Sequence, residues 1–233
     1  MKIGIIGAMK EEIVFFQQSM KKLEEVKQGE KTFYRGFWHG HETVIGQCGV
    51  GKVNAAITSQ MMIDKFEIEI IIFTGVAGGV EERLNIGDIV ISTSCQQHDI
   101  DASPLGFARG IIPMFEGPSD FPADIELVEK AFEAGIETVE AGTNVLKGKV
   151  VSGDQFIADK KEVQQLKEVF SASCVEMEGA AVAQVAYFNR VPYVIIRSIS
   201  DKANGEAAES FETFVEKAAK SSSVIVENLL KKL

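Results

Sequence analysis

Apolar positions recur along the chain in two patterns, short β-rich runs and longer segments with helical spacing. The short runs predict strands in residues 2–7, 67–75, 88–95, 148–153, 173–178 and 192–200. The longer segments predict helices in residues 11–25, 51–66, 124–135, 160–170 and 210–233. Two more runs, residues 31–38 and 42–48, predict a hairpin with Gly40 in its turn.

This alternation of strands and helices predicts one α/β domain over residues 1–233, with a mixed central β-sheet flanked by helices. The run EIEIIIFTG at residues 67–75 is almost continuously apolar, which is typical of a central strand covered on both faces. Residues 98–123 form the longest irregular stretch and contain four of the five prolines. A loop of this length inside a compact domain is usually functional.

The composition of the chain argues against several classes of protein. The 233 residues are 45% hydrophobic and 25% charged, as in ordinary soluble globular proteins. The net charge of -10 argues against a surface for nucleic acid or an anionic membrane, because a protein that follows phosphates carries a basic patch. No stretch approaches the roughly 18 apolar residues that a membrane-spanning helix needs.

The cysteines and the first residues bear on the cellular compartment. Cys48, Cys95 and Cys174 are widely spaced and form no C-x-x-C pair, which disfavours a disulfide framework or a structural zinc site. Only seven uncharged residues separate Lys2 from Lys10, too few for the apolar part of a secretory signal. We therefore expect a cytoplasmic protein.

Acidic side chains stand where strands of the predicted sheet end. Glu176 and Glu178 flank a methionine in VEMEGAA, among residues that otherwise predict buried core. A buried carboxylate is strongly unfavourable unless it is paired or hydrogen-bonded, so this pair needs a partner. Glu12 follows the first strand, and Asp201 follows the last. Each acid alone is typical of a helix N-terminus, but together they predict a carboxylate-lined crevice at the strand ends.

Three other motifs are weaker evidence for a site. GQCGVGK at residues 46–52 has P-loop spacing, but Val53 stands where Ser or Thr must hold magnesium, so we favour a glycine turn that starts a helix. HDID at residues 98–101 is a weak zinc signal, and we favour a loop ordered by its own hydrogen bonds. TGVAGGV at residues 74–80 fits either close approach of the backbone to a small molecule or a tight turn. We expect neither a metal nor a cofactor.

Seven motifs occur in the order GIIGAM-x-EE, GVGKVNAA, TGVAGG, GDIV, SGDQFI, VEMEGAA and RSISDKA. This series resembles that of the bacterial 5′-methylthioadenosine/S-adenosylhomocysteine nucleosidases, from Met1 to about Leu230. VEMEGAA and SISD are similar to motifs of the wider purine nucleoside phosphorylase family, whereas GAM-x-EE and SGD-x-FI resemble the nucleosidase branch. The resemblance implies a nucleoside phosphorylase-like fold, a homodimer, and cofactor-free hydrolysis of methylthioadenosine, S-adenosylhomocysteine and 5′-deoxyadenosine.

The resemblance also implies roles for individual residues. Asp201 would protonate the adenine, Glu12 would activate the attacking water, and Glu178 would accept hydrogen bonds from the ribose hydroxyls. Such a pairing of acid and base is the carboxylate chemistry of glycoside hydrolysis. The other substrate-binding residues would line the same pocket: Met9, Val76, Gly78, Phe156, Ile157, Met177 and Phe211.

The long loop departs from the family pattern. In well-known members an aromatic residue of the partner subunit covers the 5′-thio group, and the matching position here is Leu105. The resemblance implies that Leu105 and Pro113 form a lid on the partner's pocket, and it leaves the preference among 5′-substituents open.

Two alternatives remain, a phosphorylase and a non-catalytic nucleoside-binding protein. Phosphate needs cationic donors, and none of the five arginines lies in GAMKEE or TGVAGG, the two loops expected to face the nucleophile. Binding alone does not need both Glu12 and Asp201. We therefore expect water as the nucleophile, with Arg197 ordering the strand end before Asp201.

Overall fold

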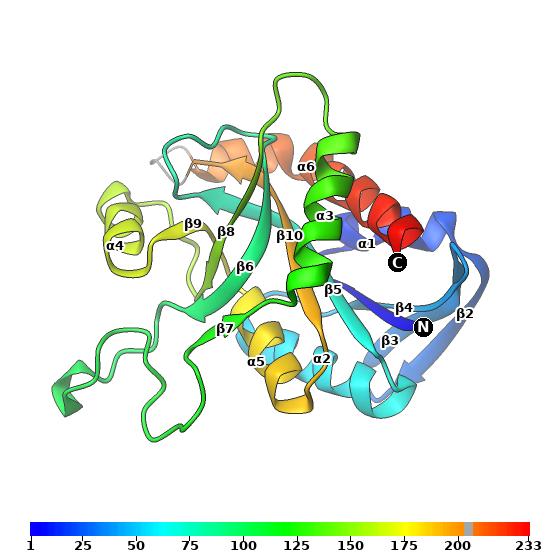
Figure 1. Ribbon diagram of the computed structural model, residues 1–233, viewed down its shortest axis with the longest axis horizontal. Coiled ribbons are helices and arrows are strands. Elements are labelled where there is room, and N and C mark those ends of the chain that lie inside the picture. Colours follow the sequence, from blue (N-terminus) through cyan, green and yellow to red (C-terminus); the bar gives the residue numbers. More distant parts are fainter. Residues whose placement is uncertain (203–206) are drawn as a thin grey trace.

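The computed structural model describes residues 1–202 and 207–233 of the chain. It contains a ten-stranded mixed sheet with helices on both sides (Figure 1). The strands are β1 (Lys2–Gly7), β2 (Lys21–Gln28), β3 (Lys31–Trp38), β4 (His41–Gln47), β5 (Ile70–Gly79), β6 (Ile89–Gln97), β7 (Asp120–Pro122), β8 (Val145–Ser152), β9 (Ala172–Glu176) and β10 (Tyr193–Asp201). The helices are α1 (Lys10–Ser19), α2 (Lys52–Phe66), α3 (Ile125–Thr138), α4 (Lys160–Phe170), α5 (Gly179–Asn189) and α6 (Ala207–Lys232), with a short 3₁₀ helix η1 (Ser103–Leu105). Among these described helices, none combines the length and apolarity needed to cross a membrane.

Part of the sheet closes on itself. The path β10–β6–β8–β9–β5 returns to β10, because β5 pairs with both β9 and β10. From β5 the sheet continues through β1, β4 and β3 to the edge strand β2, and β7 pairs with β6 off this path. Parallel pairs such as β1–β5 and antiparallel pairs such as β3–β4 occur together, so the predicted mixed sheet is confirmed.

Strand β5 is the centre of the fold, and all ten of its residues are buried. Helix α6 packs on β5 and β10 beside α1 and α3, whereas α2 and α5 pack together on the opposite side of the sheet (Figure 1). Both faces of β5 are therefore covered, as its continuous apolar run predicted.

The helix predicted for residues 11–25 is wrong in its C-terminal part. Helix α1 ends at Ser19, and the following KKLEEVKQ is strand β2, which pairs antiparallel with β3 so that Val26 lies opposite Phe33. Lys and Glu favour helices locally, but pairing with a neighbouring strand overrides that preference. Most of β2 is exposed and charged, which protects this edge of the sheet against pairing with another chain.

Helix α5 has no counterpart in the prediction. Its sequence GAAVAQVAYFN is apolar on most sides, so no polar face marks the helical period. Six of its residues are buried, and the helix packs against α2 and the sheet. It begins directly after Glu178, inside the VEMEGAA motif.

Residues 98–123 are irregular apart from η1 and β7, as predicted. Asp101 accepts a hydrogen bond from the N–H of Ser103 at 2.9 Å, and Asp99 forms an ion pair with Lys52 at 2.6 Å. The Asp101–Ser103 bond confirms that the loop is ordered in part by its own hydrogen bonds, while Asp99 ties it to α2.

Several strand ends meet at one edge of the sheet. Gly78 of β5 pairs with Asp201 of β10 and with Val175 of β9. Ser152, the last residue of β8, pairs with Glu176, the last residue of β9. The acids predicted to lie at strand ends are therefore brought to the same region of the molecule.

Candidate active site

A cavity of about 270 Å³ opens where these strand ends meet. Its walls contain all ten residues that the sequence assigned to the pocket of one subunit: Met9, Glu12, Val76, Gly78, Phe156, Ile157, Met177, Glu178, Asp201 and Phe211. Three of these carry carboxyl groups, and most of the others are apolar. The fold thus gathers side chains from both ends of the chain around one cavity.

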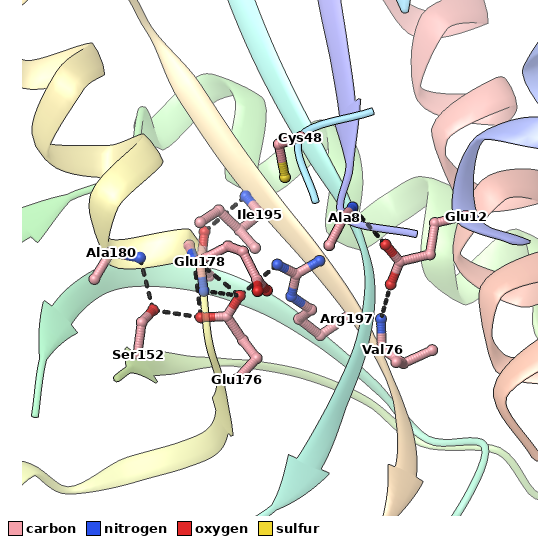
Figure 2. Close-up of polar contacts among 12 residues, drawn as sticks. Ala8, Glu12, Cys48, Val76, Ser152, Glu176, Glu178, Ala180, Ile195 and Arg197 are labelled. Carbon is pink, nitrogen blue, oxygen red and sulfur yellow. Dashed lines mark hydrogen bonds and ion pairs between the residues drawn. The ribbon is translucent and has the colours of Figure 1, made fainter. Parts of the chain in front are cut away.

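Glu12 is held by the backbone on both sides of its carboxyl group. It lies in the first turn of α1 and is only 2% exposed. Its Oε2 accepts the N–H groups of Ala8 at 2.6 Å and Met9 at 2.9 Å, and its Oε1 accepts the N–H of Val76 at 3.1 Å (Figure 2). Burial raises the pKa of Glu12, whereas Arg197 and these backbone donors lower it. Glu12 is therefore fixed between α1 and β5.

Glu178 directly precedes α5, and its Oε1 accepts the N–H of Gly51 at 2.7 Å. Gly51 has a φ of +98°, in the left-handed region that favours glycine. The GQCGVGK motif is thus a glycine turn that starts α2 and donates to Glu178, which confirms the preferred interpretation. Burial and, next, the charge of Glu176 raise the pKa of Glu178 to about 8.

Glu176 has its partner within the protein. Nη2 of Arg197 donates to Oε2 of Glu176 at 2.5 Å, and the two side chains are at most 4% exposed (Figure 2). The guanidinium also lies 4.0 Å from the centroid of the Phe73 ring. This ion pair joins β10 to β9 four residues before Asp201, and the expectation that Arg197 orders this strand end stays a prediction.

The sequence argument about arginines considered only the two loops and left out the strand residue Arg197. Arg197 lies in neither loop expected to face the nucleophile, but the charge of its guanidinium acts on Glu12. A β-carbon on Gly75 would collide with Oε1 of Glu12 and would lie 2.6 Å from Nη1 of Arg197. The Glu12 carboxyl group and the Arg197 guanidinium both lie close to Gly75 of β5. Arg197 is there because β10 pairs with β5 with Arg197 opposite Gly75. Spacing along the chain does not reveal that pairing.

Asp201 is the last residue of β10 and the third member of the carboxylate set, which consists of Glu12, Glu178 and Asp201. It is 2% exposed, and its Oδ2 accepts a hydrogen bond from the hydroxyl of Ser200 at 3.0 Å. Its pairing with Gly78 puts it beside the glycine-rich end of β5. Residues 74–79 belong to this strand, so the alternative that TGVAGGV forms a tight turn is wrong.

Two aromatic rings form another wall of the cavity. Phe156 and Phe211 meet edge to face, with ring centroids 5.9 Å apart and an interplanar angle of 83°. Met9 and Val76 pack with Phe211 in a small apolar cluster. Phe156 is 51% exposed, so half of its surface is not covered by the protein.

The two residues predicted to form a lid lie elsewhere. Neither Leu105 nor Pro113 lines the cavity of its own chain, and Leu105 is largely exposed. The prediction places them on the pocket of a partner subunit, and it stays a prediction.

Six lining residues were not named from the sequence: Ala8, Val50, Ala77, Gln155, Val175 and Ser200; Glu176, named there as one of the strand-end acids, lines the cavity as well. Each lies inside one of the quoted motifs, next to or near a residue that was named. The signal that could have found them is therefore the motif as a whole. Elsewhere in the described residues, no cluster of three or more His, Cys, Asp or Glu side chains is arranged to hold a metal ion.

Comparisons with known proteins agree with this geometry. The sequence profile of the phosphorylase superfamily matches residues 2–231. The chain is 44% identical over 232 residues to the 5′-methylthioadenosine/S-adenosylhomocysteine nucleosidase of Staphylococcus aureus strain JH9, covering 99% of this chain and 100% of that protein. The chain belongs to the phosphorylase superfamily, in its nucleosidase branch.

Solved structures of this nucleosidase branch share the whole fold. The nucleosidase of Neisseria meningitidis in complex with methylthio-immucillin-A has a TM-score of 0.94 and 36% identity, covering 100% of this chain and 99% of that chain. A futalosine hydrolase mutant of Helicobacter pylori has a TM-score of 0.93 and 35% identity, with the same coverage of 100% and 99%. The nucleoside phosphorylase-like fold expected from the motifs is therefore confirmed.

Proposed function

We propose that the chain hydrolyses the N-ribosyl bond of 5′-methylthioadenosine and S-adenosylhomocysteine, and also of 5′-deoxyadenosine. The products are adenine and methylthioribose, S-ribosylhomocysteine or 5-deoxyribose, respectively. The observation that carries the proposal is the set of three buried carboxyl groups, Glu12, Glu178 and Asp201, around one largely apolar cavity. The names of the relatives in the nucleosidase branch support the same substrates.

The chemistry divides between two carboxyl groups. Asp201 protonates N7 of the adenine, which turns the base into a better leaving group. Glu12 holds the water that attacks C1′ as the sugar acquires oxocarbenium character. One carboxyl group must carry a proton while the other is ionised, and different surroundings produce that difference. At Glu12, burial raises the pKa, while the charge of Arg197 and three backbone donors favour the ionised form; Asp201 accepts a hydrogen bond from the hydroxyl of Ser200.

The remaining lining residues bind the nucleoside. Glu178 accepts hydrogen bonds from the ribose hydroxyls, and Met177 packs against the sugar. Phe156 stacks on the purine, while the backbone of Ile157 reads the edge of the base. Gly78 lets the main chain approach the nucleoside. The apolar wall consists of Met9, Val76 and Phe211.

Water is the nucleophile in this proposal, although Arg197 lies close to Glu12. The charge of Arg197 is engaged by Glu176, and its side chain is 1% exposed. A phosphate dianion beside Glu12 would also be repelled by that carboxylate. Phosphorolysis remains the second candidate because the superfamily profile is that of the phosphorylases.

A homodimer completes the site in this proposal. Exposed apolar side chains gather on the neighbouring helices α2 and α5 and on the 98–123 loop: Val53, Ile57, Leu105, Met114 and Phe188. Exposed apolar surface of this kind is typical of an interaction face. Leu105 and Pro113 of one subunit would then cover the 5′ end of the nucleoside bound to the other.

The cellular role that follows is salvage of methionine and removal of the by-products of methyl transfer. We place the protein in the cytoplasm, where S-adenosylmethionine is consumed and where its three buried thiols stay reduced.

The test is to measure adenine and sugar products from the three nucleosides in phosphate-free buffer and then with added phosphate. The proposal predicts adenine and methylthioribose from methylthioadenosine, at a rate that phosphate does not increase. A sugar 1-phosphate, or a rate proportional to phosphate, would establish the phosphorylase. Tight binding of the nucleosides without adenine release would establish a binding protein instead.

A further inference from the structure

Glu176 is a buried carboxyl group for which the proposed reaction has no use. It ends β9, two residues before Glu178, and its side chain is 4% exposed. A buried carboxylate is stable only where it is paired and hydrogen-bonded. The hydrogen bonds and the ion pair of Glu176 therefore indicate its role in the structure.

One group of contacts fixes the start of α5. Both oxygens of Glu176 accept the N–H of Gly179 at 2.9 Å, and Oε2 accepts the N–H of Glu178 at 3.2 Å. The hydroxyl of Ser152 donates to Oε1 of Glu176 and accepts the N–H of Ala180 at 2.7 Å (Figure 2). Glu176 thus holds the backbone from which the Glu178 side chain projects.

The other contact holds Arg197. Nη2 of Arg197 donates to Glu176 at 2.5 Å, while Nη1 is directed to Gly75, where Oε1 of Glu12 also lies. In Figure 2 the guanidinium lies between the Glu176 and Glu12 carboxyl groups. Glu176 therefore fixes the cation that lies beside Glu12.

We propose that Glu176 is a positioning residue, which sets the place of Glu178 through the first turn of α5 and the place of the charge beside Glu12 through Arg197. The inference rests on the proposed function for the roles of Glu12 and Glu178. Glu176 does not exchange a proton with the substrate. A misplacement of the reacting groups by about 1 Å lowers the rate by about a hundredfold in enzymes generally, so loss of Glu176 should reduce turnover more than binding.

The charge of Glu176 has a separate, measurable consequence. The titratable groups that face Glu176 are Arg197 on β10, Glu178 before α5, Cys95 on β6, Cys174 on β9 and His98 after β6. Burial raises the pKa of both thiols and lowers the pKa of His98, so these three groups are neutral at working pH. Removing the negative charge of Glu176 therefore acts on Glu178, whose pKa falls because a like charge is lost and Arg197 is released from its partner.

The experiment compares Glu176→Gln, Glu176→Asp and a control, Asp88→Asn, by the pH dependence of kcat and kcat/KM for methylthioadenosine. Asp88 is also a buried carboxylate and accepts hydrogen bonds from Asn85 and Asn144, but it does not line the cavity. Glu176→Gln should lower kcat by about tenfold to a hundredfold, with a smaller change in KM. The acidic limb of the pH profile of kcat/KM should also lie at lower pH in Glu176→Gln than in the wild type, because the pKa of Glu178 falls. Asp88→Asn should leave both the position of that limb and kcat of the folded protein unchanged.

Glu176→Asp keeps the charge but shortens the side chain, so it should lower kcat while the acidic limb stays near its wild-type position. If Glu176→Gln folds and its limb does not move, or if Glu176→Asp keeps full kcat, Glu176 has only a structural role. Glu176→Asp decides the matter if Glu176→Gln does not fold.

A readout that needs no activity separates this inference from the proposed function. Glutamate labelled with ¹³C at the side-chain carboxyl gives a titrating signal for Glu178, assigned by its loss in Glu178→Gln. The midpoint of that signal should lie at lower pH in Glu176→Gln than in the wild type. If the wild type releases no adenine, the proposed function fails, and this midpoint alone decides the inference: an unchanged midpoint overturns it.

Discussion

The carboxylate set and the 98–123 loop are two regions of opposite character. Glu12 and Asp201 are each 2% exposed and lie at the N-terminus of a helix or at the end of a strand, with hydrogen bonds to their surroundings. Leu105 and Met114 in the loop are 70% and 91% exposed. The comparison teaches that the charged groups are held in place by hydrogen bonds within the chain, whereas the apolar side chains of the loop are exposed and free to contact a partner subunit, as proposed above.

The two regions differ because their tasks differ. Charges that develop during cleavage are stabilised best by groups that need no reorganisation, so a rigid sheet edge suits them. Recognition of a variable 5′-substituent needs only apolar contact, which a surface loop can supply. Changes in the first region should therefore act on turnover, and changes in the second on substrate preference.

The largest effect is expected for the two groups that move protons. Asp201→Asn and Glu12→Gln are nearly isosteric, and each should lower kcat for methylthioadenosine by about a hundredfold or more, because proton transfer is lost. Adenine release in steady state measures the loss, and thermal unfolding checks the fold. Asp88→Asn serves as the control for removal of a buried carboxylate away from the cavity. A variant that kept more than about a tenth of wild-type kcat would exclude the role given to that residue.

A smaller loss of turnover is expected for Glu178→Gln. The hydrogen bonds from the ribose hydroxyls to Glu178 should strengthen as charge develops on the sugar, so the variant should lose about tenfold or more in kcat and also raise KM. The 2′-deoxy nucleoside should be a correspondingly poor substrate of the wild type. Higher KM with unchanged kcat would mean that Glu178 stabilises substrate and transition state equally.

The same contrast explains what the sequence could reveal. Nine of the ten named lining residues lie in the quoted motifs, all but Phe211, and a motif keeps its residues together because strand ends are followed directly by turns or helices. The sequence did not reveal that Arg197 lies near Glu12, because that placement depends on the pairing of β10 with β5. Strand β2 and helix α5 escaped prediction for local reasons, since the first is rich in helix-forming residues and the second has no polar face.

Glu178 should also affect how the free energy of unfolding depends on pH. The pKa of Glu178 is about 8 in the folded protein, whereas the ordinary value of 4.5 applies to the unfolded chain. Between these two pH values the folded state therefore binds more protons than the unfolded state. The free energy of unfolding should therefore fall as the pH rises through this window, with a contribution from Glu178 of at most about 1.4 kcal/mol per pH unit. Chemical denaturation of the wild type and Glu178→Gln at several pH values measures it.

Glu178→Gln should show a shallower slope than the wild type. Glu126→Gln is the control, because Glu126 is exposed and its pKa is lowered by Lys130, so it stays ionised throughout the window. Equal slopes in the wild type and Glu178→Gln would exclude a raised pKa for Glu178.

The smallest effect is expected in the loop. If Leu105 covers the partner's pocket as proposed, Leu105→Ala removes apolar contact with the 5′-methylthio group and should raise KM for methylthioadenosine by about fivefold, with less change for adenosine. Ile136→Ala truncates an exposed apolar residue on α3 and should change neither KM. Sedimentation should show a dimer. Equal effects on the two nucleosides, or a monomer, would remove the loop from the site.

The central claim is that Asp201 acts by protonating the leaving group while Glu12 acts on the water. A methylthioriboside with p-nitrophenol as leaving group tests it most directly, because this leaving group departs without a proton. The rate of p-nitrophenol release by Asp201→Asn should lie within about tenfold of the wild type, although the variant is nearly inactive on methylthioadenosine, whereas Glu12→Gln should lose about a hundredfold on both substrates. Equal loss by Asp201→Asn on both substrates would contradict the division of roles.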